Sequence, residues 1–345
     1  MSKTVFIPEC MNPFEVIVNH HRYIYPGGTS QEVPDEVAEV IELHNKGHEE
    51  RKPPVSGGAG GGNTGGGGEE WFNDGNTHIW ITLPEGRTSP MLGVCPNGTV
   101  TVDWGDGTEP DVLKGTTTIG TKWTPSHEYA KPGDYIITLT TDGNIGLIGD
   151  SISGSKILRH DSTDDSRRYA YQTAIKRVEL GSHVTTISSS AFNRCYALAS
   201  VMIPNGVESI SSSAFTQCYA LASVMIPNGV KFIDNGVFYD CYSLSSVSIP
   251  DGVTTLSANL FYDCYSLSSV VIPNSVTSIG SGAFSNCRGL RYCSFANHVA
   301  VPTLASTSVF QIVAKDFQIR VPAALYDEWI TATNWTTYAS QIVAV

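Results

Sequence analysis

The chain has 345 residues, of which 41% are hydrophobic and 16% charged, and its formal net charge at pH 7 is −12. This acidic balance argues against a nucleic-acid partner and against attachment to anionic lipid, because both need a basic surface. No apolar run reaches the roughly 18 residues of a membrane-spanning helix, so we expect no membrane insertion. At about 150 residues per domain, the length predicts two or three domains. The first ten residues lack the apolar core of a secretory signal, which predicts synthesis in a cytoplasm.

Residues 1–52 predict a small α+β module. Apolar and polar residues alternate at 14–18 and again at 22–25, which predicts a β-hairpin. A helix is expected over residues 34–46, because Pro34 suits a first helical turn and Gly47 ends the pattern. A module of this size buries little apolar surface, so we expect it to bind a partner.

Residues 53–70 predict a flexible linker. Two prolines are followed by a glycine tract that only Ala59, Asn63 and Thr64 interrupt. A glycine-rich segment behaves as a flexible coil. The linker therefore separates an attachment end from a working end.

Residues 71–142 predict a β-sandwich. Three runs rich in β-branched and aromatic residues, 78–83, 99–104 and 135–140, are separated by Gly, Pro and Asn. This spacing of short strands is typical of a sandwich.

Two motifs in this segment, VDWGDGT at 102–108 and HEYAKPGDY at 127–135, resemble the paired signature of PKD domains. The resemblance implies an immunoglobulin-like spacer or interaction module with Trp104 and Tyr135 in its core. Asp103 and Asp106 are either turn residues or calcium ligands, and the turn role is the commoner one.

Residues 143–177 predict an irregular connection. The charged stretch 161–168 has no hydrophobic period and indicates a surface loop. Its aspartates Asp161, Asp164 and Asp165 also suit a cation, although a solvated loop is the commoner explanation.

Residues 178–298 repeat with a period of 23. Five cysteines keep this spacing: Cys195, Cys218, Cys241, Cys264 and Cys287. An odd number of equally spaced cysteines cannot pair completely, and no Cys-x-x-Cys supports a zinc site, so we expect a column of buried thiols. Phenylalanines recur in the same way, at Phe192, Phe215, Phe238, Phe261 and Phe284.

Five such units, stacked edge to edge, bury columns that no single unit can bury, so the repeats predict a solenoid. The pattern Val-x-Ile-Pro-Asn-Gly-Val-x-x-Ile, followed by Ala-Phe-x-x-Cys-x-x-Leu, resembles the BspA-like leucine-rich repeats of bacteria and their phages. The resemblance implies a curved solenoid that binds proteins or glycans and has no catalytic residues.

Residues 299–345 predict a C-terminal cap. The period is lost after Cys293, and the segment 321–326 with Trp329, Trp335 and Tyr338 resembles the cap that closes such arrays. The expected fold class is thus multi-domain and mainly β, with an α+β module, a PKD-like sandwich and a capped leucine-rich-repeat solenoid.

One repeated position is a candidate for ligand binding. It directly follows each cysteine of the repeats, and it is filled by Tyr196, Tyr219, Tyr242, Tyr265 and Arg288. These side chains either pack between repeats or form an exposed aromatic stripe that contacts sugar or protein. A neighbouring strip of small uncharged residues, around Met202 and Met225, suits contact with a second copy and hence a homo-oligomer.

No catalytic motif is recognisable, and neither a cofactor nor a metal is expected. Ser153-Gly154-Ser155-Lys156 matches Ser-x-x-Lys, but without the companion motifs of that chemistry. Four histidines of the N-terminal module, which are better explained as surface or turn residues than as a metal site, are His20, His21, His44 and His48.

The N-terminal segments 4–9, 12–16 and 33–42 resemble the leading segments of phage head-fibre and capsid-decoration proteins. This predicts a non-enzymatic virion protein, made in the host cytoplasm and displayed on the virion surface. Residues 1–52 would bind a capsid or other virion protein, and the solenoid would bind a host-surface protein or glycan. The alternatives are a bacterial cell-surface adhesin and, last, a glycan-active enzyme with accessory modules, which needs an acid pair in a cleft.

Overall fold

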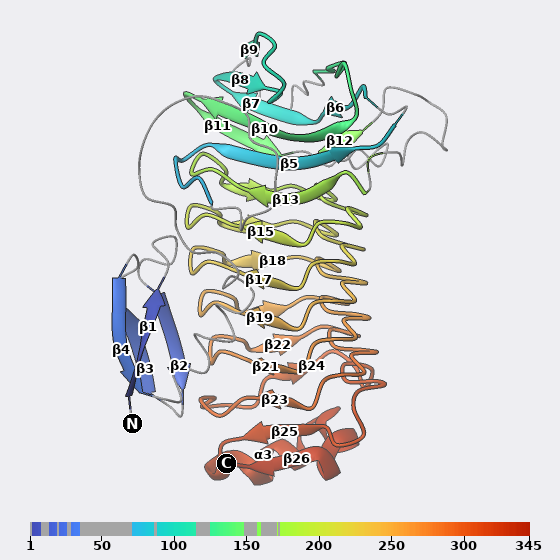
Figure 1. The fold of residues 1–345 in the computed structure, drawn as a ribbon. Helices are drawn as coiled ribbons and strands as arrows, with labels where there is room; N and C mark the ends of the chain where they lie inside the picture. The colour runs from blue at the N-terminus through green and yellow to red at the C-terminus, as the bar shows by residue number, and fades with distance from the viewer. Residues whose placement is uncertain are drawn as a thin grey trace. The chain divides into compact units, whose positions relative to one another are not determined.

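The structure is a computed structural model, and it describes residues 2–7, 14–18, 21–25, 29–34, 71–85, 88–114, 125–147, 157–159, 171 and 173–345. The chain forms two compact units, Met1–Asn73 and Asp74–Val345. What is described is mainly β-structure (Figure 1). Among these residues no helix combines the length and the apolar character needed to cross a membrane.

The first unit contains two antiparallel strand pairs. Strand β1 (Ser2–Ile7) pairs with β4 (Thr29–Pro34), and β2 (Phe14–Val18) pairs with β3 (His21–Tyr25). The pairing of Val18 with His21 closes a tight hairpin, which confirms the one expected from the alternating pattern. The predicted helix, apart from Pro34 at the end of β4, and the linker up to residue 70 lie outside the described residues.

The second unit begins with strands that continue into the repeats. The three predicted β-rich runs are confirmed as β5 (Thr77–Leu83), β8 (Thr99–Asp103) and β10 (Gly133–Thr141). They belong to a six-stranded sheet in the order β15-β13-β5-β10-β8-β9. Its other strands are β9 (Asp111–Lys114), β13 (Ile175–Glu179) and β15 (Ser200–Met202).

Strand β13 is the seam between the two parts of this unit. It pairs antiparallel with β5 on one side and parallel with β15, in the next coil, on the other. A second sheet, β18-β16-β14-β11-β7, crosses in the same way, because β11 pairs antiparallel with β7 and parallel with β14. Its strands are β7 (Val94–Asn97), β11 (Asn144–Leu147), β14 (Thr186–Ile187), β16 (Ser209–Ile210) and β18 (Phe232–Ile233). A short pair, β6 (Met91–Leu92) with β12 (Leu158–Arg159), completes this region.

The two sheets and one continuous apolar core therefore run from residues 77–147 into the repeats. The predicted boundaries at 142 and 177 fall within a single compact unit. Since the first coil of a solenoid would otherwise expose its strand edges, the preceding strands act as an N-terminal cap. Membership of the PKD family stays a prediction.

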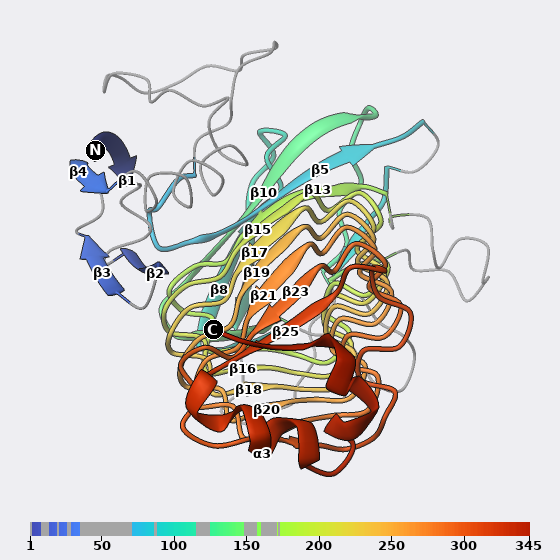
Figure 2. The same cartoon turned by 90° about the horizontal axis from the view of Figure 1, so that it is seen from below.

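Each repeat contributes one coil with two short parallel strands, and the coils lie over one another (Figures 1 and 2). Pairing is in register at 23 residues, as between Ser209 and Phe232. The remaining strands are β17 (Ser223–Met225), β19 (Ser246–Ser248), β20 (Thr255–Leu256), β21 (Ser269–Val271), β22 (Ser278–Ile279), β23 (Tyr292–Ser294), β24 (Thr303–Leu304) and β25 (Gln318–Val321).

The core of the coils consists of identical side chains stacked on each other. The repeated phenylalanines are fully buried, with centroids 5.2–5.7 Å apart, and Phe310 continues the stack at 5.5 Å. The repeated cysteines are buried free thiols, as expected. The thiol of Cys218 donates to the carbonyl oxygen of Phe192 at 3.2 Å, and the next three cysteines repeat this bond. Burial raises the pKa of Cys287 to about 12, so the thiol stays protonated.

The C-terminal end is closed by short helices and a last strand. They are η2 (Ala323–Leu325), α3 (Tyr326–Thr331), η3 (Trp335–Gln341) and β26 (Ile342–Ala344). Trp329 and Trp335 are fully buried in edge contact at 4.5 Å, and the indole of Trp335 donates to the carbonyl oxygen of Pro302 at 2.7 Å. These rings cover the end of the phenylalanine stack, as predicted for a C-terminal cap.

A substitution in the seam tests the N-terminal cap. Ile79 is fully buried in β5, opposite Val178 of β13. Changing Ile79→Ala should lower the free energy of unfolding by about 2–5 kcal/mol, because it leaves a cavity shared by both parts. Calorimetry should show a single unfolding transition at a lower melting temperature. The matched control Val112→Ala, at a position 58% exposed on β9, should change stability by less than about 0.5 kcal/mol. An unmoved transition from the repeats would contradict the shared core.

Candidate binding face on the repeats

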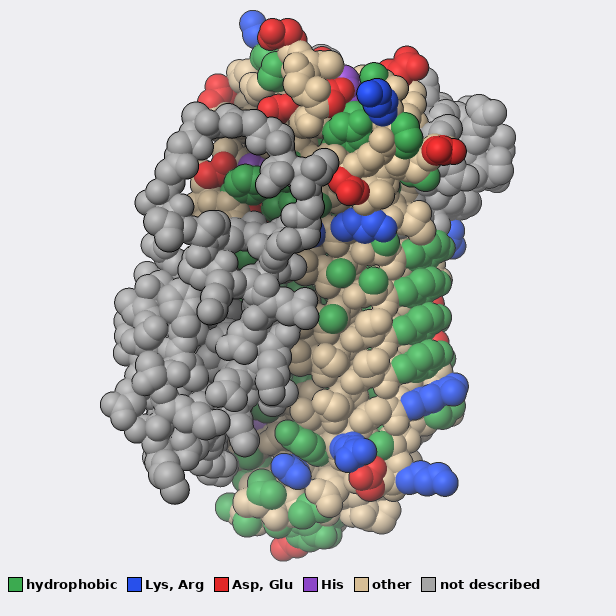
Figure 3. Space-filling model, in the orientation of Figure 1, with side chains coloured by type: hydrophobic (Ala, Val, Ile, Leu, Met, Phe, Trp, Pro, Cys, Tyr) green, Lys and Arg blue, Asp and Glu red, His purple; other side chains and the backbone are tan. Residues whose placement is uncertain are grey.

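The four repeated tyrosines form a continuous stack at one corner of the coils. Centroids of neighbouring rings lie 4.7, 4.7 and 4.8 Å apart, and the rings are parallel within 6°. Arg288 continues this tyrosine column (Tyr196, Tyr219, Tyr242, Tyr265), with its guanidinium carbon 5.1 Å from the centroid of Tyr265. Figure 3 shows one edge of the repeats as an evenly spaced column of hydrophobic side chains.

This geometry combines the two interpretations that the sequence left open. Each ring packs against its copies, as the structural interpretation requires, and each is only half-buried. Because neighbouring rings cover one another's faces within the column, the faces of the inner rings are closed to a ligand. Stacking of a sugar on an open aromatic face is thus not what these positions offer.

A second repeated column, which the sequence analysis missed, lies where the backbone turns just before each repeated cysteine. The residues just before the repeated cysteines have left-handed backbone, with φ between 59° and 61°. They form the polar column, which consists of Arg194, Gln217, Asp240, Asp263 and Asn286. The visible signal was a polar residue immediately before every cysteine, several of them Asp or Asn, the types that tolerate this conformation.

Hydrogen bonds run along the polar column from both ends toward its centre. Arg194 Nε donates to Gln217 Oε1 at 2.9 Å, and Gln217 Nε2 donates to Asp240 Oδ2 at 3.2 Å. From the other end, the amide of Asn286 donates to Asp263 Oδ1. The donors therefore converge on two neighbouring carboxyl groups.

The side chains of Asp240 and Asp263, one repeat apart in the polar column, interact with each other. Asp240 is only 7% exposed, and burial, followed by the contact with Asp263, raises its pKa. It also contacts the hydroxyl of Tyr242, whose pKa is raised by burial and by Asp240. The carboxyl pair thus lies beside the middle of the tyrosine column.

A shorter aromatic stack flanks the same pair. Tyr239 and Tyr262 lie 4.9 Å apart and parallel, and the carboxylate of Asp240 contributes to a raised pKa of Tyr239 after burial. The sequence analysis quoted the repeat Phe-Tyr-Asp-Cys-Tyr at 238 and 261 but did not single out its first tyrosine.

In the N-terminal cap, Asp103 and Asp106 make the hydrogen bonds expected of turn residues. Asp103 Oδ1 accepts from the amide of Gly105 at 2.9 Å, and Asp106 Oδ1 accepts from the amide of Thr108 at 3.2 Å. Asp106 Oδ2 also contacts His127 Nε2 at 2.8 Å. Trp104 is buried as predicted, whereas Tyr135 is half-buried at the rim of the core.

The side chains of the other metal candidates lie outside what the structure describes. Within the described part of the chain, no group of three His, Cys, Asp or Glu side chains is placed to hold a metal ion. His20, His44, His48 and the aspartates at 161, 164 and 165 lie outside the described residues.

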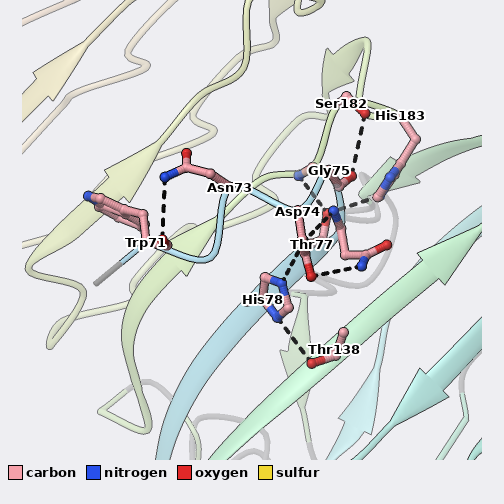
Figure 4. A network of polar contacts seen from close by, with 11 residues as sticks. Trp71, Asn73, Asp74, Gly75, Thr77, His78, Thr138, Ser182 and His183 are labelled. Atoms are coloured by element: carbon pink, nitrogen blue, oxygen red, sulfur yellow. Dashed lines mark hydrogen bonds and ion pairs between the residues drawn. The ribbon is translucent and has the colours of Figure 1, made fainter. Parts of the chain in front are cut away.

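A polar network fixes the start of β5 onto the first coil (Figure 4). His78, 3% exposed, contacts Asp74 through Nε2 at 3.0 Å and Thr138 through Nδ1 at 3.1 Å. The hydroxyl of Thr77 contacts Nε2 of His183 at 3.0 Å and accepts from the amide of Gly181 at 2.9 Å. Because the two bonds of Thr77 join β5 to residues of the first coil more than 100 positions away, we assign the network to the seam.

Comparison with known families identifies the repeats. Residues 165–291 match the BspA type leucine rich repeat region, in six copies. The repeats of this part of the chain are similar to those of that family. The match starts before Val178, where the sequence analysis placed the first unit. No curated protein matches the chain significantly.

Solved structures with similar repeats are known from several bacteria. A leucine-rich repeat protein of T. pallidum is 27% identical with a TM-score of 0.39, over 46% of this chain and 80% of that one. A leucine-rich cell surface protein of Faecalibacterium prausnitzii is 23% identical with a TM-score of 0.29, over 45% of this chain and 56% of that one. The pneumococcal vaccine antigen PcpA is 17% identical with a TM-score of 0.40, over 59% of this chain and 45% of that one. The chain spans about half the length of these last two proteins.

The carboxyl pair predicts a pH-dependent stability. The unfolded chain holds Asp240 near the ordinary pKa of 3.8, and the folded protein holds it higher, so the folded state gains stability as pH falls through this window. Changing Asp240→Asn keeps the left-handed backbone and removes the charge. It should raise the free energy of unfolding at pH 7 by several tenths of a kcal/mol, about the scale of a facing charge pair.

The gain should shrink as the pH falls and Asp240 becomes protonated in the wild type. Denaturant unfolding between pH 3 and pH 8 measures it. Asp251→Asn, at an exposed turn of the same array, is the control and should give no such difference. An equal effect of both variants at every pH would refute the coupling of the pair.

Proposed function

We propose that the protein is a non-enzymatic, surface-displayed binding protein whose repeats carry the binding face. The observation that carries this is the tyrosine column, a single chemical group repeated at a fixed spacing of 4.7–4.8 Å on a rigid array. The BspA type repeats are consistent with it, since stacked repeats offer extended surfaces for recognition.

The column is held in place before any ligand arrives. Ring stacking, the polar column behind it and the cysteine–carbonyl bonds fix each tyrosine from three directions. A preorganised side chain loses little conformational entropy on binding. Many weak contacts then add, and display of many copies on one particle multiplies them by avidity.

For the carrier, the proposal is a phage virion of head-fibre or capsid-decoration type, bound through residues 1–52. It is supported by the likeness of the N-terminal segments to such proteins and by the glycine tract at 57–68, which lies between residues 1–52 and the second compact unit. A bacterial cell surface is the alternative carrier. In both cases the ligand is a protein or glycan on a target cell.

Substitutions in the column test recognition against packing. Tyr219→Phe with Tyr242→Phe keeps the ring stack and removes two hydroxyl groups. We expect binding to target cells to fall at least about tenfold, because hydrogen bonds to the ligand are lost. Tyr219→Ala with Tyr242→Ala should abolish binding. Flow cytometry with labelled protein and a thermal melt measure both properties.

The matched control is Tyr262→Ala, which removes a stacked tyrosine beside the column. It should lower the melting temperature as much as a single column substitution does, and leave binding intact. If the column variants lose stability without a selective loss of binding, the tyrosines are structural.

Deleting residues 1–52 tests the anchor. The remainder contains the complete second unit, so its melting curve should match that of the intact protein. We expect the shortened protein no longer to co-sediment with virions, or with cells if these are the carrier. Continued co-sedimentation would show that the anchor lies elsewhere.

A further inference from the structure

Basic residues outnumber acidic ones in the last two coils. Between Cys264 and Tyr326 there are four basic residues and a single acidic one, Asp316, although the whole chain has a net charge of −12. The four basic residues are Arg288, Arg291, Lys315 and Arg320. Three of them are exposed and Arg320 is half-buried; Figure 3 shows positively charged side chains gathered at this end of the drawn face.

Backbone contacts bring these residues onto adjacent coils. The amide of Gln318 donates to the carbonyl oxygen of Arg291 at 2.8 Å, and the amide of Ala314, next to Lys315, donates to that of Leu290 at 3.3 Å. Ser294 pairs with Arg320 across β23 and β25. We call the four residues the cationic end.

Two of the guanidinium groups are held flat against tyrosine rings. Arg320 lies 4.1 Å from the centroid of Tyr292, and Arg288 lies 5.1 Å from that of Tyr265, with its Nε donating to Asn286 at 2.9 Å. Within the part of the chain that the structure describes, none of the four basic residues forms an ion pair. Each arginine therefore keeps donors for an external anion, in the planar arrangement that suits carboxylate or sulfate.

The charge changes sign along the tyrosine column. Its middle lies beside Asp240 and Asp263, and its end is Arg288. A polymer with a negative charge on every unit would meet the carboxyl pair, which opposes it. A neutral hydroxyl-bearing chain is compatible with the tyrosine hydroxyls and ring edges, and an acidic group at one end of that chain would reach the cationic end.

We propose that the repeats bind an oligosaccharide whose terminal sugar is acidic, with its neutral units along the tyrosine column and its anionic group on Arg288 and the cationic end. This rests on the proposed function, and it names the class of ligand. A repeating saccharide matches a repeated column, whereas a folded protein surface presents no such repeat. Carboxylated and sulfated sugars share the chemistry that the arginines recognise.

Binding of the full-length protein to three polymer-linked probes, sialyllactose, sulfolactose and lactose, tests the proposal by biolayer interferometry. The wild type should bind one or both acidic probes at least about tenfold more tightly than lactose, the scale of a charge-assisted hydrogen bond. Arg288→Gln should remove this preference by weakening the binding of the acidic probes to the level of lactose. Lys231→Gln, an exposed lysine elsewhere on the repeats, is the matched control and should retain it. Preference for one acidic probe identifies the anionic group.

Equal binding of acidic and neutral probes would overturn the proposal, and so would equal effects of the two charge variants. Tighter binding of inorganic polyphosphate than of either acidic probe would also overturn it, because it would indicate a general polyanion site. If cell binding still requires Tyr219 and Tyr242 in those cases, only this inference fails. If cell binding is indifferent to the tyrosines while the acidic probes still require Arg288, the proposed function fails as formulated.

Discussion

In an in-register parallel array, every side chain has its own copy as its neighbour. The 23-residue period enforces this at each position of the coils. Apolar groups and aromatic rings gain from such pairing, and so do thiols that each donate to a carbonyl of the previous coil. Equal charges lose from it, which accounts for repeats with few charged residues in a chain that is only 16% charged.

Asp240 and Asp263 are an exception to this rule, because they place two acidic side chains one period apart. Their surroundings show how the array compensates for the repulsion. Two aspartates one period apart must face each other, so the array supplies amide donors from both sides and a tyrosine hydroxyl. Burial and the neighbouring carboxyl group raise the pKa of Asp240, which favours its neutral form and so reduces the repulsion. The candidate binding face and this electrostatic compromise are therefore built from adjacent positions of the same repeat.

The sequence could predict whatever depends on period alone. The buried phenylalanine and cysteine columns, the alignment of Tyr196 to Tyr265 with Arg288, and the burial of Trp329 and Trp335 follow from spacing and residue type. The pairing of β5 with β13 could not be predicted in this way, because it joins Ile79 to Val178 across about 100 residues with no repeat to reveal the partner. The polar column was missed since its members differ chemically, and what they share is a backbone angle. Which part of each tyrosine faces the solvent also required coordinates, because ring orientation depends on the corner geometry.

Closure at both ends has a consequence for how the array changes over generations. The segment 195–207 is repeated letter for letter at 218–230, so recombination between the copies can remove or add one complete coil. The cap strands and the terminal tryptophans contact only the outermost coils, and they would meet an equivalent surface after such an event. The array would lengthen or shorten by one layer of about 4.8 Å, the ordinary distance between paired strands. The length of the array therefore changes by whole coils, and each duplicated coil adds one tyrosine to the column.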